Sequence, residues 1–288
     1  MGPGAIGSTV AALLHQAGHR VLLCGRTPRD AIEVRPDGGE PIVIPGPVHT
    51  DPQSITTPVD VVLLAVKDTQ NADAAPWLAR LCDAGTVVLA LQNGVEQVSR
   101  VGRYCPQATV LPAAVWFSAE LQPAGWVRQR TPARLVLPDE PAAHGLLDQL
   151  HGPALTVEID PDFLTAAWRK LLTNAVAGLM VLTGRRSGMF RRDDVAALAR
   201  SYLAECLAVA RAEGAELPDD MVEQTAALFA EIPEDMTTSI LTDRELGRAL
   251  EWDIRNGVIA RKGAEHGIAT PISDVLVPLL AAAGDGPG

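Results

Sequence analysis

A glycine-rich turn at the start of the chain constrains the fold more than any other feature of the sequence. Residues 2–7 have the sequence Gly-Pro-Gly-Ala-Ile-Gly, which matches the pattern G-x-G-x-x-G. In this pattern the first glycine permits a tight turn, the second lets the main chain approach a pyrophosphate, and the third lets the next helix pack against a sheet. Such a turn also arises by chance, so the segments that follow it decide its meaning.

The segments after the turn are those of a dinucleotide-binding fold. A helix is predicted over residues 9–17, a turn follows at Gly18, and an apolar run predicts a strand over residues 20–24. A pyrophosphate would lie on main-chain N–H groups at the helix N-terminus, where the helix dipole favours negative charge. A strand normally precedes such a turn. We therefore expect a Val- and Ile-rich strand of about five to eight residues upstream of Met1, or a fold that compensates in another way.

The first half of the chain alternates between apolar runs and helical stretches. The runs predicted as strands are residues 20–24, 59–66, 86–91 and 109–115, and the predicted helices are residues 9–17 and 71–82. Continuous apolar runs of this length are typical of strands buried on both faces of a parallel sheet. One or two edge strands are predicted within residues 126–137. We therefore predict a Rossmann-type, doubly wound α/β domain over residues 1–158.

The second half lacks strand patterns and is predicted to form an all-helical domain over residues 159–288. Asp160 and Pro161 favour a helix start, and Gly184 favours the end of that helix. Further helices are predicted over residues 193–213, from about Pro218, over residues 245–266 and from Pro271. The fold class is thus α/β with an all-helical C-terminal domain.

Charge, hydropathy and cysteine usage exclude several classes of function. The formal net charge of −11 argues against a nucleic-acid partner, which would need clustered Lys and Arg. No apolar run reaches the roughly 18–20 residues that a membrane helix needs, and no signal peptide is visible, so we expect a cytoplasmic protein without a membrane partner. The four cysteines are far apart and form no CxxC pair, so no metal site is predicted.

The end of the predicted second strand indicates which dinucleotide is bound. Cys24 and Gly25 are followed by Arg26, where an NAD-binding fold usually has an acidic residue for the ribose 2′-hydroxyl. An arginine suits a 2′-phosphate, because its guanidinium stays charged and binds phosphate with two hydrogen bonds. Arg26 therefore predicts NADPH as the cofactor, with Arg29 as a second contact, although a solvated surface arginine would also fit this position.

Polar residues at two strand ends and on one helix are candidate site residues. Lys67 and Asn93 follow buried strands, and ligands of open α/β sheets bind at the carboxyl ends of strands. Asn-Gly is also a common turn pair. Lys170 and Asn174 are four apart and share one helix face. A lysine in such a helix is more often a residue at the edge of the buried face that extends its ammonium to solvent. Glu251, taken alone, could equally be a solvated carboxylate on a helix.

Taken in order, the motifs of the chain resemble those of the ketopantoate reductase family. They are Gly-x-Gly-Ala-Ile-Gly, the Val-Lys strand end, Gln-Asn-Gly, Trp-Arg-Lys-Leu-x-x-Asn, Ser-x-x-x-Asp, and a closing Asn-Gly followed by Gly-Ile-x-Thr-Pro. Together they cover essentially the whole chain and are far more specific than any one of them. The resemblance implies NADPH-dependent reduction of a small 2-oxo acid, 2-dehydropantoate, to pantoate in coenzyme A biosynthesis.

The same resemblance implies a role for each candidate residue. Lys170 matches the general acid, and Glu251 is a second catalytic residue that positions Lys170 or binds a substrate hydroxyl. The positions that match substrate-binding residues are Asn93, Asn174 and Ser239. The positions that match cofactor-binding residues are Gly2, Pro3, Gly4, Ala5, Ile6, Gly7, Arg26, Lys67 and Asn93. In the implied reaction C2 of the acid accepts a hydride, and the Lys170 ammonium polarises the carbonyl and protonates the alkoxide.

One departure from the family pattern leaves the identity of the acid open. The family often has a second asparagine one turn beyond Asn174, where this chain has Gly178, so a polar contact to the substrate is expected to be missing. An alternative is a dehydrogenase of a 3-hydroxy acid, which also pairs a Rossmann domain with a Lys and an Asn four apart. Another is a non-catalytic NADP(H)-binding regulator, which needs only residues 2–7 and Arg26. The segments around Ser239 and Glu251 favour the reductase, and a homodimer is left open.

Overall fold

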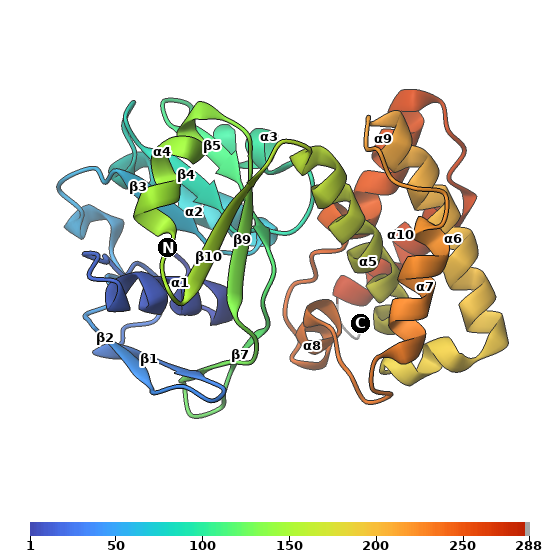
Figure 1. The fold of residues 1–288 in the computed structure, drawn as a ribbon, viewed down its shortest axis with the longest axis horizontal. Coiled ribbons are helices and arrows are strands. Elements are labelled where there is room, and N and C mark those ends of the chain that lie inside the picture. Colours follow the sequence, from blue (N-terminus) through green and yellow to red (C-terminus); the bar gives the residue numbers. More distant parts are fainter. Residues whose placement is uncertain (286–288) are drawn as a thin grey trace. The chain divides into compact units, whose positions relative to one another are not determined.

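A computed structural model describes residues 1–285 of the chain (Figure 1). The chain divides into two compact units, Met1–Phe163 and Leu164–Gly288, and residues 286–288 lie outside the described part. The domain boundary predicted between residues 158 and 159 falls within the last strand of the first unit, β10 (Leu155–Asp160). Within the described residues, no helix combines the length and the apolar character that crossing a membrane requires.

The first unit contains the predicted parallel sheet. Its strands β3 (Val61–Leu64), β4 (Val87–Ala90) and β5 (Thr109–Pro112) lie side by side in that order and are parallel throughout. Helices α2 (Asn71–Leu81) and α3 (Gln97–Gly102) connect them. Apolar side chains of the sheet are buried, as continuous apolar runs predict. The α/β class and the Rossmann-type sheet are therefore confirmed.

Two further sheets complete the first unit, and they correct the prediction of edge strands over residues 126–137. One sheet has the order β2-β1-β8-β7 and the other the order β10-β9-β6. The new strands are β1 (Ala31–Pro36), β2 (Ile42–Pro45), β6 (Ala114–Val115), β7 (Ala119–Leu121), β8 (Val127–Gln129) and β9 (Ala133–Pro138). Strands β8 and β9 each have a neighbour on both sides, so neither is an edge strand. The remaining elements of this unit are α1 (Ala5–Gln16), α4 (Pro141–Leu150) and the short turns η1 (Pro52–Ser54) and η2 (Asp68–Gln70).

The strand predicted over residues 20–24 is wrong. Only Cys24 forms a parallel bridge, with His49, and on its other side the Cys24 carbonyl accepts one hydrogen bond from the Gly2 amide at 3.0 Å. Met1 in turn lies against β3, where its carbonyl accepts from the Ala65 amide at 3.0 Å. The run is extended, but so few hydrogen bonds on either side do not make a ladder. The expected upstream strand concerns residues before Met1 and stays a prediction.

The second unit is helical, as the sequence predicts. Its elements are α5 (Phe163–Thr183), η3 (Ser187–Arg191), α6 (Asp193–Ala212), α7 (Met221–Glu231), α8 (Ser239–Glu245), the π-helical turn η4 (Asp253–Gly257), α9 (Val258–His266) and α10 (Pro271–Gly284). Helix α5 is long and mostly buried, with Trp168 and Met180 inaccessible to solvent. It ends before Gly184, whose φ of 64° suits the predicted stop.

The single helix predicted over residues 245–266 is wrong. Helix α8 ends at Glu245, and Gly247 has a φ of 62°, a backbone conformation that ends a helix and favours glycine. Residues 248–251 have no regular structure, and η4 and α9 follow. Glu251 therefore lies just before a π-helical turn, a feature often found at functional sites, and not inside a regular helix.

Candidate functional site

The first and third glycines of the N-terminal turn are required by close packing. Gly2 has a φ of 79°, and a Cβ atom added there would lie 2.7 Å from the amide nitrogen of Val66. A Cβ atom on Gly7 would lie 2.4 Å from the carbonyl oxygen of Gly2. A Cβ atom on Gly4, by contrast, would meet nothing within 4 Å. The turn is thus packed against the end of β3 at two glycines and faces open space at the middle one.

The N-terminus of α1 carries N–H groups that suit an anion. Gly4 is the N-cap of the helix, makes no side-chain capping bond, and no acidic residue lies in the first turn. The first N–H groups of a helix have no partner within the helix, so they are donors for a phosphate. Together with the open space at Gly4, this turn fits a pyrophosphate.

Arg26 lies beside this turn because Gly25 packs against Pro3. A Cβ atom on Gly25 would lie 2.7 Å from Cδ of Pro3, so only a glycine allows this approach. Arg26 is exposed, and among residues 1–285 its guanidinium has no hydrogen bond or ion pair. Arg29 donates instead to the carbonyl oxygen of Gly125 at 3.3 Å. Arg26 is therefore the cation at the turn that is available to a ligand.

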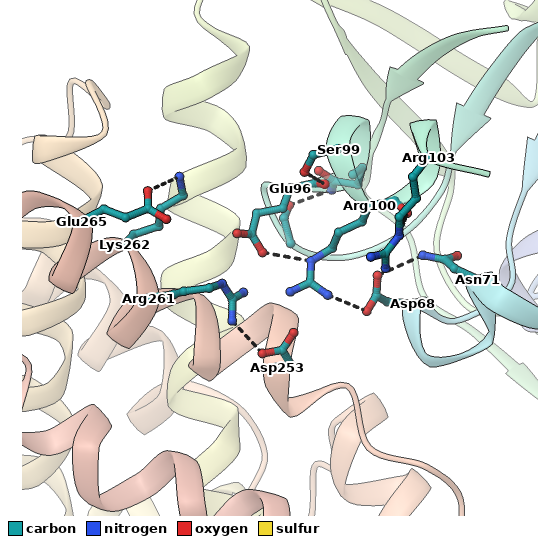
Figure 2. Close-up of polar contacts among 12 residues, drawn as sticks. Asp68, Asn71, Glu96, Ser99, Arg100, Arg103, Asp253, Arg261, Lys262 and Glu265 are labelled. Carbon is teal, nitrogen blue, oxygen red and sulfur yellow. Dashed lines mark hydrogen bonds and ion pairs between the residues drawn. The ribbon is translucent and has the colours of Figure 1, made fainter. Parts of the chain in front are cut away.

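A hydrogen-bonded network stiffens the loops after β3 and β4, where Lys67 and Asn93 lie half-buried. Gln92 Nε2 donates to Asn71 Oδ1 at 2.6 Å and to the Val66 carbonyl at 2.9 Å. Figure 2 shows the continuation of the network, in which the Asn71 amide donates to an Asp68 oxygen at 3.0 Å.

An arginine completes this network. Arg100 of α3 pairs with Asp68 at 3.0 Å and with Glu96 at 2.9 Å (Figure 2). The sequence interpretation included the Gln-Asn-Gly motif but missed its partners Asn71, Asp68 and Arg100. Asp68 and Asn71 are ordinary polar residues near helix starts, and Arg100 lies in the last turn of α3, so no local pattern distinguishes them. The network fixes the main chain at the carboxyl ends of two strands, where ligands of such sheets bind.

In the second unit, Lys170 and Asn174 lie half-buried on α5, one turn apart. Burial and, to a smaller extent, the nearby positive charge of Arg255 together lower the pKa of the Lys170 ammonium to about 7. Desolvation disfavours the charged form of a lysine, and a second cation acts in the same direction. Lys170 is therefore a group that can exchange a proton near neutral pH.

A buried guanidinium joins two of the predicted residues. Nη2 of Arg255, in η4, lies 3.4 Å from a carboxylate oxygen of Glu251 and donates to Ser239 Oγ at 3.1 Å. Arg255 is 1% and Glu251 is 6% exposed, whereas Ser239, the first residue of α8, is exposed. The structure therefore brings Ser239 and Glu251 together, through a residue that the sequence interpretation did not consider.

Asn256 occupies the space next to Gly178. A Cβ atom on Gly178 would lie 2.8 Å from Nδ2 of Asn256, which donates to the Ala175 carbonyl at 2.8 Å and to the Tyr202 hydroxyl at 3.0 Å. The amide oxygen of Asn256 is buried and has no hydrogen-bond partner in the described part of the chain. The amide expected from α5 at position 178 is absent, and an amide from η4 lies there instead.

The turn η4 is held to the next helix by an ion pair. Figure 2 shows Arg261 of α9 reaching back to Asp253, with 2.7 Å between Nη1 and Oδ1. Arg255 could have been found from its four-residue spacing from Glu251, and Asn256 belongs to the closing Asn-Gly motif, but neither pattern reveals that these side chains are buried. Within residues 1–285, no cluster of three His, Cys, Asp or Glu side chains could hold a metal ion.

Comparisons with known proteins agree along the whole chain. The family model described as "Ketopantoate reductase PanE/ApbA" matches residues 1–141, and the model of the C-terminal part of the same family matches residues 162–283. A 2-dehydropantoate 2-reductase of Mycobacterium tuberculosis (strain CDC 1551 / Oshkosh) is 65% identical over 288 residues, which is 100% of this chain and 98% of the relative.

Two solved structures share the fold over nearly their full length. A dimeric ketopantoate reductase of Staphylococcus aureus has a TM-score of 0.89 at 25% identity, with 100% of this chain and 98% of that chain covered. A ketopantoate reductase of the PanE/ApbA family from Ralstonia eutropha JMP134 has a TM-score of 0.87 at 30% identity, with 99% and 97% covered.

Proposed function

Because the chain belongs to the ketopantoate reductase PanE/ApbA family, we propose that it reduces 2-dehydropantoate to pantoate with NADPH. The observation that carries the assignment to this site is the lysine on α5, whose pKa of about 7 lets it act as an acid near neutral pH. A general acid works best when its pKa is close to the operating pH.

The residues of the first unit fit NADPH. The N–H groups at the start of α1 would hold the pyrophosphate beside Gly4, and Arg26 would bind the 2′-phosphate. Lys67 and Asn93 would contact the cofactor from the loops after β3 and β4. When bound, NADPH supplies the hydride. The protein supplies position and charge.

Lys170 would donate the proton that the reaction requires. As C2 of the 2-oxo acid receives the hydride, its carbonyl oxygen gains negative charge, which an ammonium stabilises and then neutralises by proton transfer from Nζ. Glu251 would position Lys170 or bind a substrate hydroxyl. Asn93, Asn174 and Ser239 would donate hydrogen bonds to the oxygens of the acid. The family pattern supports these roles.

The test is a panel of 2-oxo acids with NADPH, followed at the absorbance of the nicotinamide. Turnover of 2-dehydropantoate above the other acids supports the assignment. Oxidation of 3-hydroxy acids in preference would indicate the related dehydrogenase class. Binding of NADPH without turnover of any acid would indicate a regulator and would overturn the enzyme assignment.

We also propose a homodimer in the cytoplasm. The Staphylococcus aureus relative is described as dimeric, which supports a dimer here. All four cysteines are buried and unpaired, which suits a reducing compartment. Light scattering coupled to size exclusion should give twice the monomer mass of 30.4 kDa. A monomeric mass over the concentration range used for the assay would contradict the dimer.

A further inference from the structure

Arg255 has more hydrogen-bond donors than the described residues satisfy. Its Nη2 group contacts Ser239 and Glu251, but its Nε–H is buried and has no acceptor within residues 1–285. Nε and Nη2 form one edge of the guanidinium, and this is an edge to which a carboxylate binds with two parallel hydrogen bonds. A buried donor without an acceptor is costly, so the edge is suited to a ligand that supplies one.

The contact with Glu251 does not satisfy this edge. One carboxylate oxygen lies 3.4 Å from Nη2, which is long for a charge-assisted hydrogen bond, and no contact of that carboxylate reaches Nε. Ser239 Oγ accepts from Nη2, so the hydroxyl proton of Ser239 is free to donate to another acceptor. Ser239 is exposed, so a ligand that reaches its hydroxyl lies next to the Nη2 group of Arg255, which is 3.1 Å from Ser239 Oγ.

We propose that Arg255 binds the carboxylate of the 2-oxo acid, with Ser239 as its hydrogen-bonding neighbour, and thereby selects acids over neutral ketones. The inference rests on the proposed function, because a 2-oxo acid has its carboxylate on the carbon next to the reacting carbonyl. An anchor for the carboxylate close to Lys170 would hold the carbonyl oxygen near the acid. Arg255 acts by binding and takes no part in bond making.

The charges around Lys170 support this placement. The positive charge of Arg255 lowers the pKa of Lys170 in the absence of substrate. A bound carboxylate would offset that charge and return the pKa toward its ordinary value. Lys170 would then be protonated when an acidic substrate is bound. A neutral ketone would bring no such compensation, so the same arginine would contribute to both affinity and the state of the acid.

The test compares an acid with its neutral counterpart in Arg255→Gln. Inhibition constants of pantoate and of its uncharged lactone are measured against 2-dehydropantoate, in the wild type and in the variant, together with NADPH affinity and melting temperature. Pantoate should bind about 10- to 100-fold more weakly to the variant, as expected for a lost charged hydrogen bond. Affinity for the lactone and for NADPH should change less than about threefold. Arg248→Gln, at an exposed arginine of the same unit, should leave all four values unchanged.

A second readout separates binding from a structural role. Removing the cation should raise the pKa of Lys170, so the alkaline limb of kcat/KM should move to higher pH in Arg255→Gln. Arg255→Lys keeps the positive charge but loses the guanidinium edge formed by Nε and Nη2. It should therefore keep the alkaline limb of the wild type and bind pantoate more weakly. The Arg255→Lys variant also allows the test if Arg255→Gln does not fold.

The outcomes are distinguishable. Equal weakening of pantoate and lactone, or pantoate affinity within threefold of the wild type, would overturn the role of Arg255. If the wild type itself does not turn over 2-dehydropantoate, the proposed function fails, and the role of Arg255 fails with it.

Discussion

The two units hold their parts of the candidate site in different ways. In the first unit the decisive groups belong to the main chain: two glycines packed so tightly that a methyl group would collide, and a helix N-terminus left without a side-chain cap. In the second unit the groups of the candidate site are charged side chains: Glu251 and Arg255 are buried, and Lys170 is half-buried. Under the proposed function, a cofactor phosphate would thus be bound by backbone shape and the acid by charged side chains.

The sharpest test of this contrast is Lys170→Ala. Removing a general acid should lower kcat by about 10²- to 10⁴-fold, whereas NADPH affinity should stay within a factor of about two. Steady-state kinetics and a fluorescence titration with NADPH measure the two effects. Glu251→Ala should act on kcat and KM together, and the double variant should lose less than the product of the two single losses. Turnover close to that of the wild type in Lys170→Ala would show that another residue is the general acid, and Lys67 would be the next candidate.

The exception in the first unit is Arg26, where a side chain and not the main chain is expected to act. Arg26→Ala should weaken NADPH binding by about 1.5–3 kcal/mol and leave NADH binding unchanged, because the lost contact is to the 2′-phosphate. Parallel titrations of both cofactors measure this. Arg80→Ala, at an exposed arginine in the last turn of α2, is the matched control. Equal affinity of the wild type for NADPH and NADH would contradict the assignment of Arg26 to the 2′-phosphate.

A pair of glycine substitutions tests the role of backbone shape. Gly7→Ala should cost about 1–3 kcal/mol of folding stability, because its Cβ atom would lie 2.4 Å from the Gly2 carbonyl oxygen. Gly4→Ala has room and should keep the melting temperature, while it weakens NADPH binding by placing a methyl group where phosphate is expected. Thermal melts with and without NADPH distinguish the two. If both variants melt alike and bind alike, packing does not explain the motif.

The smallest expected effect is the pH dependence, which concerns the second unit. The acid must be protonated to donate, so kcat/KM should be constant below the pKa and fall as the pH rises through about 7. The fall should not exceed about tenfold per pH unit for a single group. The limb in kcat should lie at higher pH, because a bound carboxylate raises the pKa of Lys170. A kcat/KM profile flat from pH 6 to 9 would contradict the role of Lys170.

Sequence patterns predicted local features well and long-range contacts poorly. The glycine turn, the parallel strands β3, β4 and β5 and the ends of α5 and α6 each depend on a few neighbouring residues, and all were predicted. Strands β1 and β2 were missed because they are short and their buried residues alternate with more exposed ones, unlike the long apolar runs of β3, β4 and β5. The break at Gly247 was missed because the flanking residues favour a helix, and a single glycine with positive φ ends it.

The same difference between local motifs and long-range contacts applies to the residues of the candidate site. Lys170, Asn174 and Asn93 were predicted because each belongs to a motif, and Glu251 because it matches a position of the family pattern. Arg255 was not predicted, because its proposed role depends on its burial, and burial depends on how α8 and η4 pack. Gly178 was interpreted as the loss of a polar group, whereas the structure places the amide of Asn256 in that space. A missing side chain on one helix can be a vacancy that another segment fills.

The contact between Gly178 and Asn256 couples the two positions in any redesign of this part of the second unit. Only one amide fits there, so Gly178→Asn alone introduces a collision, and Asn256→Gly alone leaves the Tyr202 hydroxyl and the Ala175 carbonyl without their donor. The two positions have to be exchanged together. Asn256 is also connected through Tyr202 to the packing of α6, so a mutant library that varies Gly178 should vary position 256 in the same clones.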